Sequence, residues 1–210
     1  LMSKATTTKG NTHKRTQKPQ RKAYYDAGLV RKHLKYILDA FDVYHKQFNN
    51  KRYVYHYLAY GENRTQEIVF FKRNFMHLCG VVAYPGGSKA FYEDCRLRKL
   101  AVNKVGFGHR NHFQNKLKVI KQLKQLAQPQ NIGITDGVIC YKRTDFGTMI
   151  RTKEDILAIG TIEDRLTKQT VPLSLINVQV DRTQLRTLIT NYICVDRLEI
   201  FDFRTGEAVN

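Results

Sequence analysis

The 210-residue chain contains no tryptophan, only four prolines, and 18 acidic residues against 36 lysines and arginines. No apolar stretch approaches the roughly 18 residues that a membrane-spanning helix requires. The N-terminal residues are polar and basic, without the apolar segment of a secretory signal. We therefore expect a cytoplasmic protein that has no membrane partner.

Metal-binding and nucleotide-binding motifs are also lacking. The four cysteines are scattered, with no CxxC pair, so we expect buried free thiols rather than a disulfide framework or a zinc cluster. His109 and His112 form an HxxH pair, but no carboxylate or thiolate is close to them in sequence. There is no glycine-rich phosphate loop and no alternation of strands and helices. We expect no metal ion and no other cofactor.

Positive charge is what the sequence has in excess. The net charge is +18 and the pI is about 9.9, which indicates a polyanionic partner, most often nucleic acid. Residues 1–22 hold seven lysines and arginines and no acid, and their composition is typical of a flexible tail. This tail either contacts phosphates or is a solvated extension without a role. Residues 23–210 carry the remaining +11, and we expect them to form a single domain.

A second one-sign stretch runs from residue 95 to residue 135 and contains no acid at all. Soluble domains normally mix both signs on their surface, so this stretch predicts a nucleic-acid-binding face. The alternative is a solvated helix face that is basic without a binding role. The candidate binding residues are Arg96, Arg98, Lys99, Lys104, Arg110, Lys116, Lys118, Lys121 and Lys124.

The hydrophobic patterning predicts an α+β fold with helices first and an antiparallel sheet after them. Candidate helices are residues 24–48, 89–100, 116–127 and 182–189. Candidate strands are residues 53–60, 66–71, 132–141, 149–151, 156–162 and 193–203, the first two forming a hairpin. Residues 172–175 are expected to open a short turn or helix.

The segment from Asn74 to Val81 holds the strongest candidate for chemistry. Asn74 is a good helix N-cap residue, which would place His77 in the first helical turn. Free amides and the helix dipole favour an anion there, so Lys72, Arg73 and His77 predict a phosphate site with a titratable group. The alternative is a hydrogen-bonded core histidine.

Several segments of the sequence, and the order of the predicted elements, resemble the phage-associated branch of the Barnase–EndoU–Colicin–RelE (BECR) nuclease fold. The resemblance is carried by residues 74–80, by residues 91–95, by the leucine-rich helix with lysines, and by a β region that ends in residues 172–175. It covers roughly residues 25–200. The resemblance implies a curved antiparallel sheet, metal-independent RNA cleavage, and a toxin or effector of a phage or mobile element.

The resemblance also implies roles for particular residues. His77 matches the family histidine position and would act either as the base that takes the 2′-hydroxyl proton or as the acid that protonates the leaving oxygen. Lys72 and Arg73 would hold the phosphate. Only one of the two would point into the site, because successive side chains of an extended segment point in opposite directions. Ser174 matches a family hydroxyl position, and Thr148 is a second hydroxyl candidate. His109 and His112 are the candidates for a second proton-transfer group.

Two classes of function fit this sequence. The first is a metal-independent ribonuclease, with RNA favoured over DNA and a possible antitoxin or immunity protein as partner. The second is a non-catalytic protein on the same fold that binds nucleic acid or a ribonucleoprotein, as an anti-defence or accessory factor.

Deletion of residues 1–22 tests the interpretation of the tail. The melting temperature should stay nearly unchanged, because the segment is too polar to bury a core, while RNA affinity at low salt should fall. Calorimetry and a filter-binding titration measure the two effects. A large loss of thermal stability would show that the segment is docked on the domain.

Overall fold

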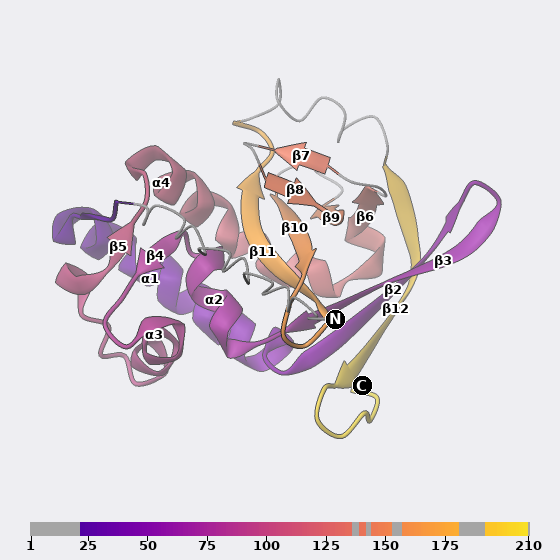
Figure 1. The fold of residues 1–210 in the computed structure, drawn as a ribbon, viewed down its shortest axis with the longest axis horizontal. Helices are drawn as coiled ribbons and strands as arrows, with labels where there is room; N and C mark the ends of the chain where they lie inside the picture. Colours follow the sequence, from indigo (N-terminus) through magenta and orange to yellow (C-terminus); the bar gives the residue numbers. More distant parts are fainter. Residues whose placement is uncertain (1–21, 136–138, 142–143, 153–156, 181–191, 210) are drawn as a thin grey trace, which may run out of the picture.

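A computed structural model describes residues 22–135, 139–141, 144–152, 157–180 and 192–209. Its main feature is a curled, seven-stranded antiparallel sheet, with the helices gathered on one side (Figure 1). The sheet order is β11-β10-β9-β6-β12-β2-β3. The strands are β2 (Lys51–Ala59), β3 (Glu62–Phe70), β6 (Ile132–Thr135), β9 (Thr148–Thr152), β10 (Leu157–Glu163), β11 (Thr170–Asn177) and β12 (Ile193–Asp202). The predicted α+β class is confirmed.

Strong curvature brings the two edges of this sheet together. The edge strands β3 and β11 are in contact. The Thr148 hydroxyl on β9 donates a hydrogen bond of 2.8 Å to Oε1 of Gln66 on β3. The sheet is therefore a half-barrel, as the resemblance implied.

Two smaller sheets complete the β structure of the described residues. One has the order β1-β5-β4 and the other pairs β7 with β8. Their strands are β1 (Tyr24–Tyr25), β4 (Val81–Ala83), β5 (Gly106–Phe107), β7 (Ile139–Tyr141) and β8 (Thr144–Phe146).

The helical layer consists of four α-helices joined by shorter turns, within the part of the chain that the structure describes. The α-helices are α1 (Ala27–Val43), α2 (Lys72–Leu78), α3 (Gly87–Arg96) and α4 (Arg110–Val119). The shorter elements are the π-helical turn η1 (Tyr44–Phe48) and the 3₁₀ segments η2 (Val102–Lys104), η3 (Ile120–Ala127) and η4 (Pro129–Asn131).

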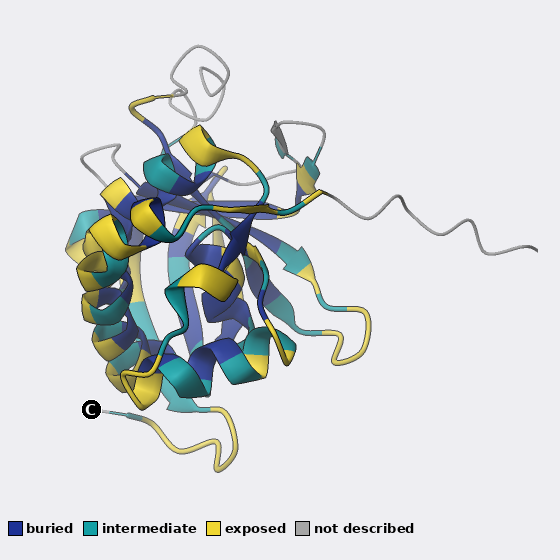
Figure 2. Ribbon diagram, turned by 90° about the vertical axis from the view of Figure 1, so that its left-hand side faces the viewer, coloured by how far each residue is buried: buried dark blue, intermediate teal, exposed yellow. Residues whose placement is uncertain are grey.

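An aromatic core joins the helices to one face of the sheet. Phe75 of α2 is fully buried, with its ring centroid 5.6 Å from that of Phe41 and 5.1 Å from that of Tyr44. The buried Tyr44 hydroxyl donates to the carbonyl of Phe71 at 2.8 Å, so its polar atom is satisfied inside the core. This core holds α2 against the end of β3 (Figure 2, dark blue).

A smaller apolar cluster lies on the other face of the same strands, because successive side chains of a strand alternate. Met149 of β9 belongs to this second cluster, whereas its neighbour Ile150 belongs to the main core. A side chain at Gly160 would collide with the ring of Phe146 there, so this position requires glycine.

Several predicted helix boundaries were wrong. The helix expected over residues 24–48 begins only at Ala27, because the Asp26 side chain accepts from the Leu29 amide at 2.9 Å and caps the helix. The helix expected at residues 116–127 begins at Arg110 instead and continues as a 3₁₀ segment from Ile120.

The turn or helix expected at residues 172–175 is also wrong, since these residues lie inside the edge strand β11. Pro172 is tolerated there because it falls where the register with β10 shifts, at a sheet edge. The helix predicted at residues 182–189 lies outside the described residues.

The cysteines follow the prediction in part. Cys79 and Cys95 are buried free thiols, whereas Cys194 is exposed, contrary to expectation, because it lies on the solvent side of β12. The side chain of Cys140 lies outside the described part of the chain.

Candidate active site

Asn74 is not the N-cap of α2, so the predicted position of His77 in the first helical turn is wrong. Helix α2 begins at Lys72, and Asn74 is its third residue. The Asn74 Oδ1 atom accepts from the Phe71 amide at 2.9 Å, and its Nδ2 atom donates to the Pro172 carbonyl on β11 at 3.2 Å. This buried amide ties the end of β3, helix α2 and β11 together.

His77 consequently lies in the last turn of α2, where the helix dipole does not favour an anion. The residue reaches the surface, so it is not the core histidine of the alternative interpretation, although the surrounding protein still desolvates much of its ring. Its carbonyl accepts from the Lys116 Nζ atom of α4 at 3.1 Å. Lys116 is only 6% exposed, so its ammonium is held beside the histidine rather than in open solvent.

This arrangement changes the titration of the imidazole. Desolvation of the ring, followed by the positive charge of Lys116, lowers the pKa of His77, and a backbone hydrogen bond with Val81 only partly offsets this effect. The neutral imidazole therefore prevails at neutral pH, which is the form that accepts a proton.

His112 occupies the same side of α4 as Lys116, because residues four apart on a helix are neighbours. It is half-buried and lies in the helix rather than in the loop that the sequence suggested. The fold thus brings Lys116 of α4 to His77 of α2, from two helices that are far apart in sequence.

Lys72 and Arg73 diverge from each other, and each forms an ion pair. Lys72 Nζ lies 2.9 Å from Glu93 of α3, whereas Arg73 lies 3.1 Å from Asp164 in the turn between β10 and β11. The Arg73 guanidinium also stacks over the Phe71 ring, 4.6 Å from its centroid. A phosphate that binds either cation must compete with a carboxylate.

The two candidate hydroxyls lie on opposite faces of the sheet. Thr148 pairs with Thr161 and Ser174 pairs with Gly160, and Gly160 and Thr161 are successive residues of β10. Thr148 is buried and donates to Gln66, whereas Ser174 is half-buried. Because they face opposite sides of the sheet, at most one of these hydroxyls can belong to the site of His77. Among the described residues, neither hydroxyl is hydrogen-bonded to His77.

The residues of the predicted basic face form two groups: arginines that lie near acids and lysines that are exposed to solvent. Three of its arginines lie near acids: Arg96 is 2.6 Å from Glu93, Arg98 is 2.6 Å from Asp42, and Arg110 is 3.9 Å from Asp26. Five lysines are exposed, and no carboxylate of the described residues lies within ion-pair distance of them: Lys99, Lys104, Lys118, Lys121 and Lys124.

Three of these exposed lysines, Lys118, Lys121 and Lys124, lie close together in sequence. We call these three residues the lysine row. Lys118 lies in the last turn of α4, and Lys121 and Lys124 lie in η3, where side chains three apart eclipse one another. Helix α1 packs beside this segment. The lysine row is a linear array of charge suited to a phosphate backbone.

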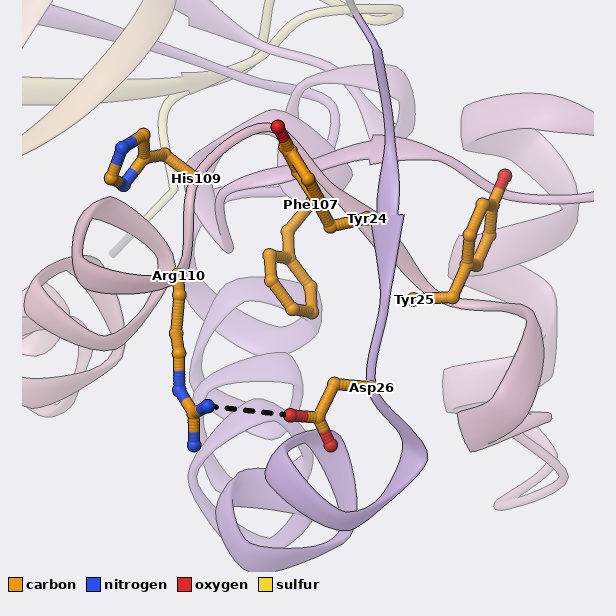
Figure 3. A pocket seen from close by; sticks show the side chains of 6 residues that line it. All are labelled: Tyr24, Tyr25, Asp26, Phe107, His109 and Arg110. Carbon is orange, nitrogen blue, oxygen red and sulfur yellow. Dashed lines mark ion pairs between the residues drawn. The ribbon is translucent and has the colours of Figure 1, made fainter.

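The sequence did not reveal a cavity between β1, β5 and the start of α4. It measures about 370 Å³ and is lined by Tyr24, Tyr25, Asp26, Phe107, His109 and Arg110 (Figure 3). Two exposed tyrosines directly after the basic tail are the signal that could have indicated it.

No group of three or more His, Cys, Asp or Glu side chains that could hold a metal ion occurs in the described ranges. No helix within them is long and apolar enough to cross a bilayer.

A protein-family model described as "phage-Barnase-EndoU-ColicinE5/D-RelE like nuclease4" matches residues 36–194. The match extends from the middle of α1 into β12, and it includes His77, Lys116 and the whole of β11. Comparisons with curated proteins and with solved structures give no match.

Replacement of Lys116 by methionine tests the electrostatic coupling at His77. Loss of the ammonium should raise the pKa of His77 toward its ordinary value, so its ring should protonate at a higher pH than in the wild type. NMR titration of the imidazole measures this shift. Lys118→Met removes the same charge from an exposed position and is the control. A His77 pKa that responds equally to both variants, or to neither, would contradict the coupling.

Proposed function

Since the chain belongs to the phage-Barnase-EndoU-ColicinE5/D-RelE like nuclease family, we propose that it cleaves RNA without a metal ion, with His77 transferring the proton. The observation that carries this proposal is the family match over residues 36–194, which contains a histidine of lowered pKa beside a buried lysine. The net charge of +18 supports nucleic acid as the substrate.

RNA carries its own nucleophile in the 2′-hydroxyl. In the proposed step the neutral His77 ring accepts the 2′-hydroxyl proton while that oxygen attacks the adjacent phosphorus. The bond from phosphorus to the 5′ oxygen breaks, and this leaving oxygen takes a proton from a second acid, for which His112 of α4 is our candidate. The products are a 2′,3′-cyclic phosphate and a free 5′-hydroxyl.

The negative charge that develops on the phosphate requires a cation nearby. Lys116 supplies a fixed positive charge beside His77. Arg73 can supply a bidentate contact, because its ion pair with Asp164 is 39% exposed on the arginine side. The pair is only partly exposed, so a phosphate would have to compete with Asp164 for the guanidinium.

A second function is favoured by the ion pairs of Lys72 and Arg73. Both candidate phosphate ligands are engaged by acids, and the Thr148 hydroxyl is engaged by Gln66. This arrangement fits a protein that keeps the fold and the lysine row but only binds nucleic acid or a ribonucleoprotein.

A role as a toxin or effector of a phage or mobile element, opposed by an antitoxin or immunity partner, extends the first proposal. Growth arrest on expression in a bacterial host, relieved by His77→Ala, would support that extension.

Cleavage of mixed-sequence RNA in excess EDTA tests the catalytic proposal. His77→Ala should slow cleavage by about 10²–10⁴-fold, since this is the usual contribution of one proton-transfer group. His56→Ala, on the far strand β2, is the matched histidine control and should keep the rate.

Loss of all cleavage in EDTA would overturn the metal-independent mechanism, and an unchanged rate in His77→Ala would overturn the role of His77. Tight RNA binding without cleavage by the wild type would instead establish the non-catalytic alternative.

Salt dependence of RNA binding tests the lysine row. Replacement of Lys118, Lys121 and Lys124 by glutamine should make the plot of log affinity against log salt less steep by about 2. Each phosphate contact on a single strand contributes about 0.7 to that slope, and three contacts would be lost. A control triple replaces Lys35, Lys168 and Arg197, which each lie within 3.6 Å of an acid. Equal slopes for the two triples would show that the row makes no phosphate contacts.

A further inference from the structure

We propose that the cavity between β1, β5 and the start of α4 binds an unpaired guanine base of the RNA substrate. This inference rests on the proposed action on RNA and adds a base preference to it. The residues 24–26 that line the cavity precede the family match, which begins at residue 36, so the match does not cover this feature.

The walls of the cavity offer an aromatic surface. Tyr24 is 51% exposed although it belongs to a strand, and its strand partner is Phe107. Phe107 is buried and stacks on Phe113, with ring centroids 4.8 Å apart and planes 14° apart. Tyr24 therefore stands above a rigid floor, and an exposed tyrosine in such a place can stack on a base.

Opposite the ring lie two charged groups. Figure 3 shows Asp26 and Arg110 at the same end of the cavity, with Arg110 Nη1 3.9 Å from the Asp26 Oδ2 atom. The Arg110 and Asp26 side chains are 65% and 39% exposed, so both can reach a ligand. The Asp26 Oδ1 atom caps α1, which fixes the direction of the carboxylate.

This pair of groups favours guanine. Guanine presents two adjacent N–H donors on its Watson–Crick edge, and a carboxylate accepts from both. Its O6 and N7 atoms accept from an arginine. Uracil flanks its single N–H with two carbonyls that a carboxylate repels, and the corresponding edges of adenine and cytosine offer fewer donors.

The cavity is also close to His77 along the small sheet. Strand β5 lies between β1 and β4, and Phe107 pairs with Tyr24 on one side and Val81 on the other. Val81 is the residue whose backbone bonds His77. Two strand spacings are about 10 Å, or about three stacked nucleotides, so a base in the cavity would lie within a few nucleotides of a phosphate at His77.

A positive charge also lies beside the aromatic wall. Lys22 Nζ lies 6.0 Å from the centroid of the Tyr24 ring, where it can pair with a phosphate next to a bound base.

Binding of 2′-O-methyl RNA pentamers tests the subsite without cleavage, because these oligonucleotides lack the nucleophile. The probes are pentauridylate and the same pentamer with one central guanosine, adenosine or cytidine. The wild type should bind the guanosine probe most tightly.

Tyr24→Ala should weaken binding of the guanosine probe about tenfold, in line with the loss of one stacking platform. Tyr24→Phe keeps the ring and should bind like the wild type. Tyr36→Ala removes an equally accessible tyrosine from α1, 46% exposed, and should leave binding unchanged.

Asp26→Asn separates recognition from folding, because asparagine caps a helix as well as aspartate does. The melting temperature should be retained, while the preference for the guanosine probe should disappear. Unchanged affinity in Tyr24→Ala, or an unchanged preference in Asp26→Asn, would overturn the subsite.

Cleavage of ordinary RNA, measured in parallel, distinguishes the two proposals. A wild type that cleaves while Tyr24→Ala binds normally refutes the subsite alone. A wild type that does not cleave but loses affinity in Tyr24→Ala refutes catalysis alone.

Discussion

The buried amide of Asn74 is the constraint on which the site depends. It joins the last residues of β3 to helix α2 through the Phe71 amide, and it joins both to the edge strand β11 through the Pro172 carbonyl. Buried polar groups are costly unless they are paired, so these two hydrogen bonds allow only one placement of α2. Because His77 is one turn further along this short helix, the same bonds fix its position relative to the half-barrel.

Curvature of the sheet makes this bridge possible. In a flat sheet β3 and β11 would be separated by five other strands, whereas in the half-barrel they are in contact. The aromatic core fills the space beneath α2, with Phe75 packed against Phe41 and Tyr44. Packing and the Asn74 bridge thus hold the helix from two sides, which is the rigidity that a positioned proton-transfer group requires.

The lysines and arginines of the basic stretch differ in how deeply they are buried and in whether an acid lies beside them. The chain has twice as many lysines and arginines as acids. Arg96 and Arg98 each lie beside a carboxylate, whereas Lys118, Lys121 and Lys124 are exposed along the end of α4 and η3. The buried Lys116 differs from both groups, because its ammonium is bonded to the His77 carbonyl and its charge lowers the pKa of the imidazole. An exposed row of charge and a local effect on one imidazole are therefore separate electrostatic features of the same basic stretch.

The sequence by itself determined the α+β class, the β2–β3 hairpin, the excess of positive charge and His77 as the residue to examine. Periodicity and composition are local properties, and they report the faces of elements and the sign of the charge. The sequence placed Asn74 wrongly as the helix N-cap. Its bond to Phe71 is local, but its bond to Pro172 depends on a contact between segments 98 residues apart. The same holds for Lys116, which looked like a surface cation and is buried against His77, and for Tyr24, Asp26 and Arg110, which share a cavity. Only the tertiary structure decided these neighbours, because sheet closure and helix packing bring together side chains whose separation along the chain carries no periodic signal.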